Sequence, residues 1–264
     1  MEKYLAVNSV AFSIGDTEIY WYGIIMCCSI LVAVLIATYF CKVRKYDSDM
    51  PINIALVVVP VGILSARLFS VLFESGLSLS DYWNFRTGGM SIIGAVVGGA
   101  LGLIVYILIK KPENKWLYFD ILVVALILAQ AIGRWGNYFN NEVYGQVVES
   151  GSTFAKFPFA VKVDGVYYQA LFFYECLFNL VGFLILSVMF LCSEKKGLPT
   201  ATYLIYYGLV RFVLEQFRQE EYILRLGSLA ISRVFSLFMI VIGVILLVIV
   251  LIQSRKKRVL NEKK

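Results

Sequence analysis

Residues 116–145 read WLYFDILVVALILAQAIGRWGNYFNNEVYG, an apolar run that ends in a cluster of polar side chains. The apolar part, Trp116–Ile132, is short for a membrane-spanning helix unless the helix extends through Trp135. The part that follows, Gly133–Gly145, carries an arginine, three asparagines and a glutamate. Such groups are costly in hydrocarbon, so we expect them to leave the apolar helix and face a protein-lined cavity. The glycines beside them allow the backbone to turn or to approach a ligand closely.

The rest of the chain repeats the apolar pattern. Hydrophobic residues make up 60% of the sequence and charged residues 16%, and the mean hydropathy is +0.78. These values are typical of polytopic membrane proteins. We therefore predict an all-α polytopic membrane protein with seven transmembrane helices, forming a single transmembrane domain over residues 1–264. The expected spans are Ile19–Phe40, Pro51–Phe73, Gly89–Ile109, Trp116–Ile132, Ala170–Cys192, Leu198–Phe217 and Leu229–Ile252.

Basic residues predict how the helices are oriented. They gather in alternate loops and in the tail, and the positive-inside rule makes these segments cytoplasmic. Seven spans then place the N-terminus outside and the C-terminus in the cytoplasm. This distribution, rather than a nucleic-acid partner, accounts for the net charge of +6. The basic groups are Lys42, Arg44 and Lys45, then Lys110, Lys111 and Lys115, then Lys195 and Lys196, and finally residues 255–258, 263 and 264.

The longest segment between the predicted spans, residues 137–168, is expected to form a small extracytoplasmic head. Its apolar stretches alternate with polar residues, which is typical of short strands. The Asp164-Gly165 pair between Val163 and Val166 predicts a hairpin turn.

The chain contains no histidine. This excludes any mechanism that needs an imidazole, including Ser-His-Asp and Cys-His nucleophiles and HExxH metal sites. The five cysteines fall within or at the ends of spans without metal-ligand spacing, so we interpret them as apolar packing residues. We expect neither a metal site nor a cofactor.

Several charged residues lie within or at the edges of the predicted spans. An ionisable group at such a depth predicts a functional site, and the alternative is a structural ion pair or a side chain that reaches the interface. Arg211 and Glu215 are four residues apart, so they share a helix face and can pair with each other. The full set is Arg67, Arg134, Glu142, Glu175, Arg211, Glu215, Arg218 and Arg233.

These arginines predict an anion site near the outer leaflet. Arginine stays charged and binds phosphate through two parallel hydrogen bonds, and the natural anion at that depth is a phospholipid headgroup. Arg134 and Arg211 are the principal candidates, joined by Arg67 or Arg218. Neutral hydrogen bonds are available from Asn137, Asn140 and Asn141, and a phenol from Tyr22, although aromatic residues are also common at the membrane interface.

The third predicted span carries glycines at positions 88, 89, 94, 98, 99 and 102. Small residues at this spacing allow helices to pack closely in a membrane, and they can equally shape a backbone surface around a lipid. From the residues alone, an enzyme, a lipid transporter and a lipid-binding scaffold all remain open.

The order and spacing of these motifs resemble the prolipoprotein diacylglyceryl transferases of bacterial plasma membranes. The similarity runs from Trp21 to Arg218, and the glycine-arginine-x-glycine-asparagine signature is its most specific part. The matching residues are Trp21-Tyr22-Gly23, Ala66-Arg67-Leu68, Gly88-Gly89-Met90-Ser91, Gly133, Arg134, Gly136, Asn137, Asn140, Glu142, Gly145, Tyr174-Glu175, Arg211-Phe212, Glu215, Phe217 and Arg218.

The chain departs from the family pattern at three places. Ile93 stands where the family usually has a histidine, and Gln169-Ala170 stands where it has a histidine-proline pair. Ser232-Arg233 takes the place of a glycine-glutamine pair. The first change removes a residue that the family is thought to use near the reacting thiol, which keeps open a diverged, non-catalytic paralogue that binds or moves anionic phospholipid.

The resemblance implies transfer of diacylglyceryl from phosphatidylglycerol to the lipobox cysteine of a prolipoprotein in the bacterial plasma (inner) membrane. A thioether forms and glycerol phosphate leaves, as the first step of lipoprotein maturation. The expected catalytic residues are Arg134, Arg211, Tyr22 and Glu142. The expected substrate-binding residues are Asn137, Asn140, Gly145, Gly88, Gly89, Arg67, Glu215 and Arg218.

Overall fold

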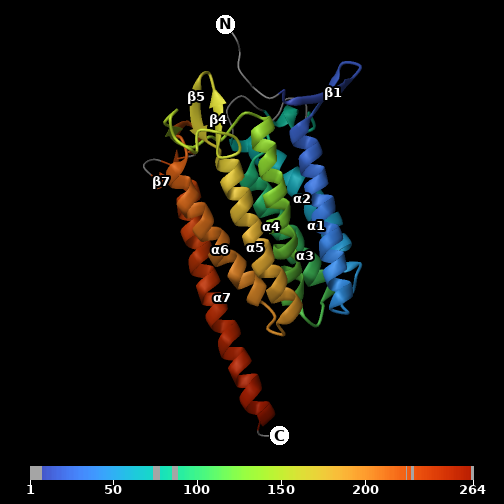
Figure 1. Ribbon diagram of the computed structural model, residues 1–264. Coiled ribbons are helices and arrows are strands. Elements are labelled where there is room, and N and C mark those ends of the chain that lie inside the picture. The colour runs from blue at the N-terminus through green and yellow to red at the C-terminus, as the bar shows by residue number, and fades with distance from the viewer. Residues whose placement is uncertain (1–7, 74–77, 85–88, 224, 227–228, 263–264) are drawn as a thin grey trace. The chain divides into compact units, whose positions relative to one another are not determined.

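The computed structural model describes residues 8–73, 78–84, 89–223, 225–226 and 229–262 (Figure 1). Helices dominate these ranges, and short strands lie between them. The long helices are α1 Trp21–Val43, α2 Met50–Phe73, α3 Ile92–Lys110, α4 Lys115–Phe139, α5 Leu171–Cys192, α6 Leu198–Leu214 and α7 Ile231–Glu262. The strands are β1 Val10–Ile14, β2 Thr17–Tyr20, β3 Val147–Val148, β4 Ala160–Val163, β5 Val166–Gln169, β6 Arg225–Leu226 and β7 Leu229–Ala230.

Six of these helices, all except α6, are long and apolar enough to cross a membrane. Helix α6 has 17 residues, which is the short end of what a bilayer requires. The prediction of an all-α polytopic membrane protein is confirmed. Which end of each helix faces the cytoplasm stays a prediction.

Several helix ends differ from the predicted span boundaries, and polar side chains explain the difference at the end of α4. Helix α4 continues to Phe139 instead of ending at Ile132, because its last polar residues bind other protein groups and do not require the helix to stop. Helix α6 ends at Leu214 and passes into the 3-10 turn Glu215–Phe217. The seventh helix begins at Ile231, after the β6–β7 pairing, rather than at Leu229.

The described chain divides into two compact units, residues 37–122 and residues 1–36 with 123–264. The boundaries fall inside α1 and α4, so both helices contribute to both units. The prediction of one transmembrane domain over the whole chain stays a prediction.

In the first unit, α2 and α3 pack against each other through glycines. A Cβ atom at Gly94 would lie 2.5 Å from the backbone oxygen of Ser65, and one at Gly98 would overlap the Ser65 side chain. The packing interpretation of these two glycines is therefore confirmed.

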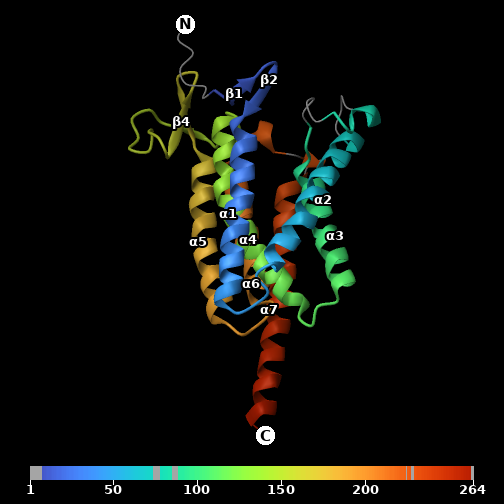
Figure 2. The same ribbon diagram turned by 90° about the vertical axis from the view of Figure 1, so that its right-hand side faces the viewer.

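The second unit contains the N-terminal part of α1, most of α4, and helices α5–α7. Glycines also bring its helices together. A Cβ atom at Gly182 of α5 would lie 2.5 Å from both Ile127 of α4 and Tyr206 of α6. At Gly208 of α6 it would lie 3.0 Å from the backbone oxygen of Ser236 in α7. The strands of this unit gather at one end of its helices, and α7 extends past the others at the opposite end (Figures 1 and 2).

The predicted head contains a three-stranded antiparallel sheet in the order β3-β5-β4. The predicted hairpin turn is confirmed, because Asp164 and Gly165 join β4 to β5 with φ values of 47° and 86°. Tyr144 packs beside this sheet with its ring centroid 6.1 Å from that of Tyr168. Burial raises the pKa of Tyr144 to about 12, so this phenol stays neutral at physiological pH.

A second hairpin, β1–β2, precedes the first helix. This hairpin was not predicted, and the first span, expected to begin at Ile19, would have started inside β2. Its turn at Asp16 and Gly15 uses a glycine with φ 59°.

We expect the head to lie outside the cytoplasm and the end of α7 to lie inside, because of the lysine and arginine bias. Single cysteines at Ser152 and Lys256, in a variant that lacks the five native cysteines, test this. A membrane-impermeant thiol reagent added to intact cells should label the cysteine at Ser152 alone. Labelling of the one at Lys256 alone would contradict the predicted topology.

Candidate active site

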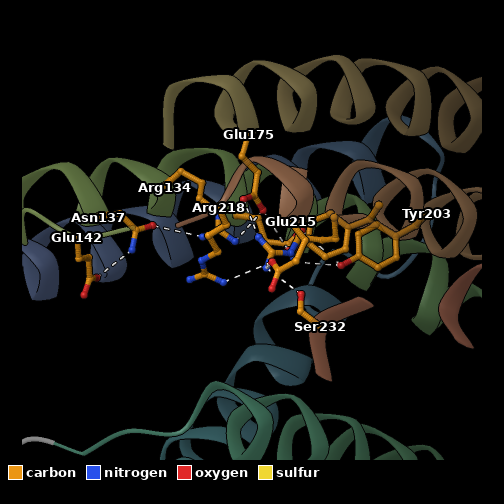
Figure 3. Close-up of polar contacts among 11 residues, drawn as sticks. Arg134, Asn137, Glu142, Glu175, Tyr203, Glu215, Arg218 and Ser232 are labelled. Carbon is orange, nitrogen blue, oxygen red and sulfur yellow. Dashed lines mark hydrogen bonds and ion pairs between the residues drawn. The ribbon is translucent and has the colours of Figure 1, made fainter. Parts of the chain in front are cut away.

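Five charged side chains from α4, α5, α6 and the turn that follows α6 form a continuous ion-pair network. Arg134 Nη2 lies 2.7 Å from Glu175 Oε1, and Arg211 Nη1 lies 3.0 Å from Glu175 Oε2. Arg211 Nη2 then lies 3.1 Å from Glu215 Oε2, and the same oxygen is 3.5 Å from Arg218 Nη1. We call this set the arginine–glutamate ladder (Figure 3). The predicted Arg211–Glu215 pair is confirmed.

The two glutamates of the ladder are buried, and the three arginines are partly reachable. The side chains of Glu175 and Glu215 are 4% and 0% exposed, whereas Arg134, Arg211 and Arg218 are 17–18% exposed. Three guanidiniums and two carboxylates leave a net charge of +1. The buried carboxylates hold the guanidiniums in place and leave part of each guanidinium exposed.

The ladder and nearby apolar side chains line one pocket. Its lining combines charged and amide groups with apolar side chains. The lining residues are Arg134, Asn137, Val143, Leu171, Phe172, Glu175, Arg211, Leu214, Glu215 and Arg218.

Asn137 extends the ladder from Arg134 to Glu142. Its Oδ1 accepts a hydrogen bond of 3.3 Å from Arg134 Nη1, and its Nδ2 donates one of 2.9 Å to Glu142 Oε1. Asn140 donates a longer bond of 3.4 Å to the same carboxylate oxygen. Glu142 is thus held by amides, while Glu175 and Glu215 are held by guanidiniums (Figure 3).

Tyr22 reaches this site because Gly136 leaves room for its ring. A Cβ atom at Gly136 would lie 2.6 Å from Tyr22 Cδ2. The phenol lies within electrostatic range of both Glu142 and Arg134. Gly136 therefore allows the ring of Tyr22 to approach the α4 backbone closely. The backbone does not turn at this position, because Gly136 lies within α4.

Gly145 connects the head to the ladder through its backbone. It forms an antiparallel bridge with Arg218, and its N–H donates to the carbonyl of Gln169 at 2.9 Å. A Cβ atom here would lie 2.8 Å from the side chain of Gln169. The absence of a side chain lets the loop after α4 pass closely between β5 and Arg218.

Arg67 and Gly89 belong to the other unit. Arg67 is fully buried and donates to three backbone carbonyls, those of Gly89 at 2.9 Å, Asp81 at 2.6 Å and Asn84 at 2.7 Å. These bonds give Arg67 a structural role in holding the loop between α2 and α3, and its substrate-binding role stays a prediction. Gly88 lies outside the described residues.

Sequence reasoning did not place four neighbours of the ladder. Tyr207 donates a hydrogen bond of 3.4 Å to Glu175 Oε1 and stacks on Tyr203 with ring centroids 5.5 Å apart. Gln130 donates to the Tyr203 hydroxyl at 3.1 Å. Ser232 of α7 accepts a bond of 3.1 Å from Arg211. Tyr203, Tyr207 and Arg211 are spaced four residues apart on α6, and this spacing is the signal that could have grouped the two tyrosines with Arg211.

A family model described as prolipoprotein diacylglyceryl transferase matches residues 9–249. The chain belongs to this family. It is therefore a membrane-embedded transferase, and the resemblance inferred from its motifs is confirmed.

Relatives similar to this family member carry a more specific name, phosphatidylglycerol–prolipoprotein diacylglyceryl transferase. The protein from Clostridium botulinum (strain Loch Maree) is 34% identical over 245 residues, which cover 90% of this chain and 95% of the relative. One from Clostridium perfringens (strain 13) is 35% identical over 260 residues, covering 96% and 98%. One from Listeria innocua is 32% identical over 250 residues, covering 92% and 89%.

Replacing Arg134 by lysine should lower activity at least tenfold, although the charge is preserved. A lysine ammonium is a point charge and cannot bond Glu175 and Asn137 in the fork geometry of the guanidinium. Lipidation of a model prolipoprotein at matched expression measures the effect. The control is Arg255→Lys, an exposed position in the tail that should keep parental activity. Full activity of Arg134→Lys would place the anion site elsewhere.

Gly136→Ala should also reduce lipidation at least tenfold, because the added methyl group would displace the ring of Tyr22. Gly151→Ala is the matched control, since a Cβ atom there meets nothing within 4 Å. Thermal unfolding in detergent should be followed for both variants. Equal activity of the two alanine variants would show that the position of Tyr22 does not matter.

Proposed function

We propose that this transferase moves the diacylglyceryl group of phosphatidylglycerol to the lipobox cysteine thiol of a prolipoprotein. A thioether forms and glycerol phosphate leaves, at the extracytoplasmic side of the bacterial plasma membrane. The names of the relatives support both substrates. The match covers nearly the whole of this chain and of each relative, which favours the same activity here.

The charge of the ladder carries this proposal. Phosphatidylglycerol has one phosphodiester with a single negative charge, and the ladder brings three guanidiniums together in one pocket. The guanidiniums of Arg134 and Arg211 are held together by one buried carboxylate, so neither has to be ordered when the lipid binds. Preorganised cations of this kind stabilise charge that develops on a leaving group.

In the proposed reaction, the thiolate sulfur attacks the glyceryl carbon that bears the phosphodiester. The carbon–sulfur bond forms as the carbon–oxygen bond breaks, and the electron pair leaves with glycerol phosphate. The departing phosphate gains a second negative charge, which Arg134 and Arg211 oppose.

The substrate thiol must first lose its proton. A free cysteine thiol has a pKa of about 8.5, and neighbouring guanidiniums lower it, so the ladder itself favours the thiolate. Glu142 is the carboxylate of the site that is held by amides, and it assists as the proton acceptor. The phenol of Tyr22 lies within electrostatic range of Glu142 and can assist by hydrogen bonding. This division of roles needs no imidazole.

A second candidate is a diverged paralogue that binds or moves anionic phospholipid without catalysis. The observation that favours it is the absence of histidine, in particular Ile93 at the position where the family usually has one. The ladder would serve lipid binding equally well, so only a measurement of thioether formation separates the two candidates.

We expect the purified chain to form a thioether on a lipobox peptide with phosphatidylglycerol in detergent. The rate should rise between pH 6 and pH 8, because the ionised fraction of the substrate thiol increases over this range. Ile93→His should raise the rate near neutral pH, provided that the variant unfolds at the parental temperature.

A histidine-containing family member in the same assay is the positive control. If it is active while the folded parent and the folded Ile93→His variant both form no thioether from pH 6 to pH 8, the transferase proposal fails and the lipid-binding paralogue remains.

A further inference from the structure

Arg211 is held by groups from three parts of the chain. Its Nη1 donates to Glu175 of α5 at 3.0 Å, and its Nη2 donates both to Glu215 and to Ser232 of α7, each at 3.1 Å. Figure 3 shows the Ser232 side chain directed toward the ladder. Through Ser232, α7 therefore contacts Arg211 directly, and Arg211 is one of the two guanidiniums that we propose stabilise the leaving phosphate.

The three acceptors differ in charge. Glu175 and Glu215 hold Arg211 by neutralising it, and each also pairs with a second arginine. The Ser232 hydroxyl accepts a hydrogen bond without cancelling any positive charge. An anion that binds Arg211 competes with the carboxylates for its N–H groups and for its charge. The hydroxyl occupies one N–H of Arg211 but carries no charge that repels the anion, so its bond can remain when the phosphate arrives.

The packing of α7 on α6 places this hydroxyl rigidly. Gly208 lies one turn before Arg211 on α6, and a Cβ atom there would come within 3.0 Å of the Ser236 backbone oxygen. Ser236 lies one turn after Ser232 and is itself buried. The two helix backbones are therefore in close contact one turn away from the Arg211–Ser232 bond, which leaves little freedom to lengthen it.

We propose that Ser232 is a positioning residue for the transfer reaction. It fixes the orientation of Arg211 toward the lipid phosphate through a neutral hydrogen bond from α7. This inference rests on the proposed function, and it adds a residue outside the charged network to the machinery that stabilises the leaving group.

The test compares Ser232→Ala with Ser236→Ala. Both serines lie on the same face of α7, but the Ser236 hydroxyl donates at 2.7 Å to the backbone carbonyl of Ser232 and not to the ladder. Ser232→Ala should lower kcat/KM roughly tenfold, the effect of one hydrogen bond to a charged group. Ser236→Ala should stay within twofold of the parent, and Ser232→Thr, which retains the hydroxyl, should recover most of the activity.

A binding measurement separates positioning from mere structural support. Glycerol phosphate titrated into the detergent-solubilised protein reports the affinity of the anion site without turnover. Ser232→Ala should weaken this binding several-fold while the unfolding temperature stays parental, and Ser236→Ala should not change it.

Each outcome decides one of the two claims. If the parent forms thioether and both alanine variants match it in kcat/KM and in glycerol phosphate affinity, the role of Ser232 is overturned and the proposed function stands. If the parent forms no thioether, the proposed function fails, and the glycerol phosphate titration alone decides whether Ser232 positions Arg211. A loss of activity in Ser232→Ala that only follows a loss of folded protein would also overturn the inference.

Discussion

The carboxylate of Glu175 lies between two guanidiniums, and the arrangement of the site depends on it. Arg134 and Arg211 come from α4 and α6, and each binds a different oxygen of this one side chain. The guanidiniums of Arg134 and Arg211 both lie beside this carboxylate, so their like charges repel each other. The negative charge between them offsets that repulsion. Removing Glu175 would leave Arg134 without its carboxylate and Arg211 with the carboxylate of Glu215 alone. The loss would exceed that of an exposed pair, because the carboxylate itself is buried. The registers of α4, α5 and α6 are thus tied together at this point.

The neighbouring elements hold the ladder by close backbone approach. Gly136 admits the ring of Tyr22 beside Arg134, and Gly145 lets the loop after α4 pair with Arg218. Asn137 uses both ends of its amide, accepting from Arg134 and donating to Glu142. Each of these contacts needs a small residue or an amide of fixed geometry, and so the signature around Arg134 has a physical reason as well as a family resemblance.

The parts of the site that were predictable from the sequence are local. Arg211 and Glu215 are one helical turn apart, and their pairing followed from that spacing. The Asp164-Gly165 turn followed from residues that tolerate a positive φ. In each case the partners are neighbours in the chain, so the backbone geometry of a helix or a turn determines the contact.

The parts that were not predictable depend on contacts between distant segments. Nothing in the spacing indicates that Glu175 lies between Arg134 and Arg211, because the register of three packed helices decides it. The end of α4 was misplaced for the same reason, since Arg134 was expected to terminate the apolar helix and instead finds its partner on α5. Arg67 was expected to be a ligand-binding cation. Its guanidinium instead donates hydrogen bonds to the backbone carbonyls of Gly89, Asp81 and Asn84, which are distant in the sequence.

The location of the lipid phosphate tests the central claim most directly. An experimental structure of the protein in nanodiscs of phosphatidylglycerol should show a phosphate within hydrogen-bond distance of both Arg134 and Arg211, with Glu175 still between them. A phosphate bound elsewhere, with both guanidiniums occupied only by Glu175, Glu215 and Ser232, would contradict it.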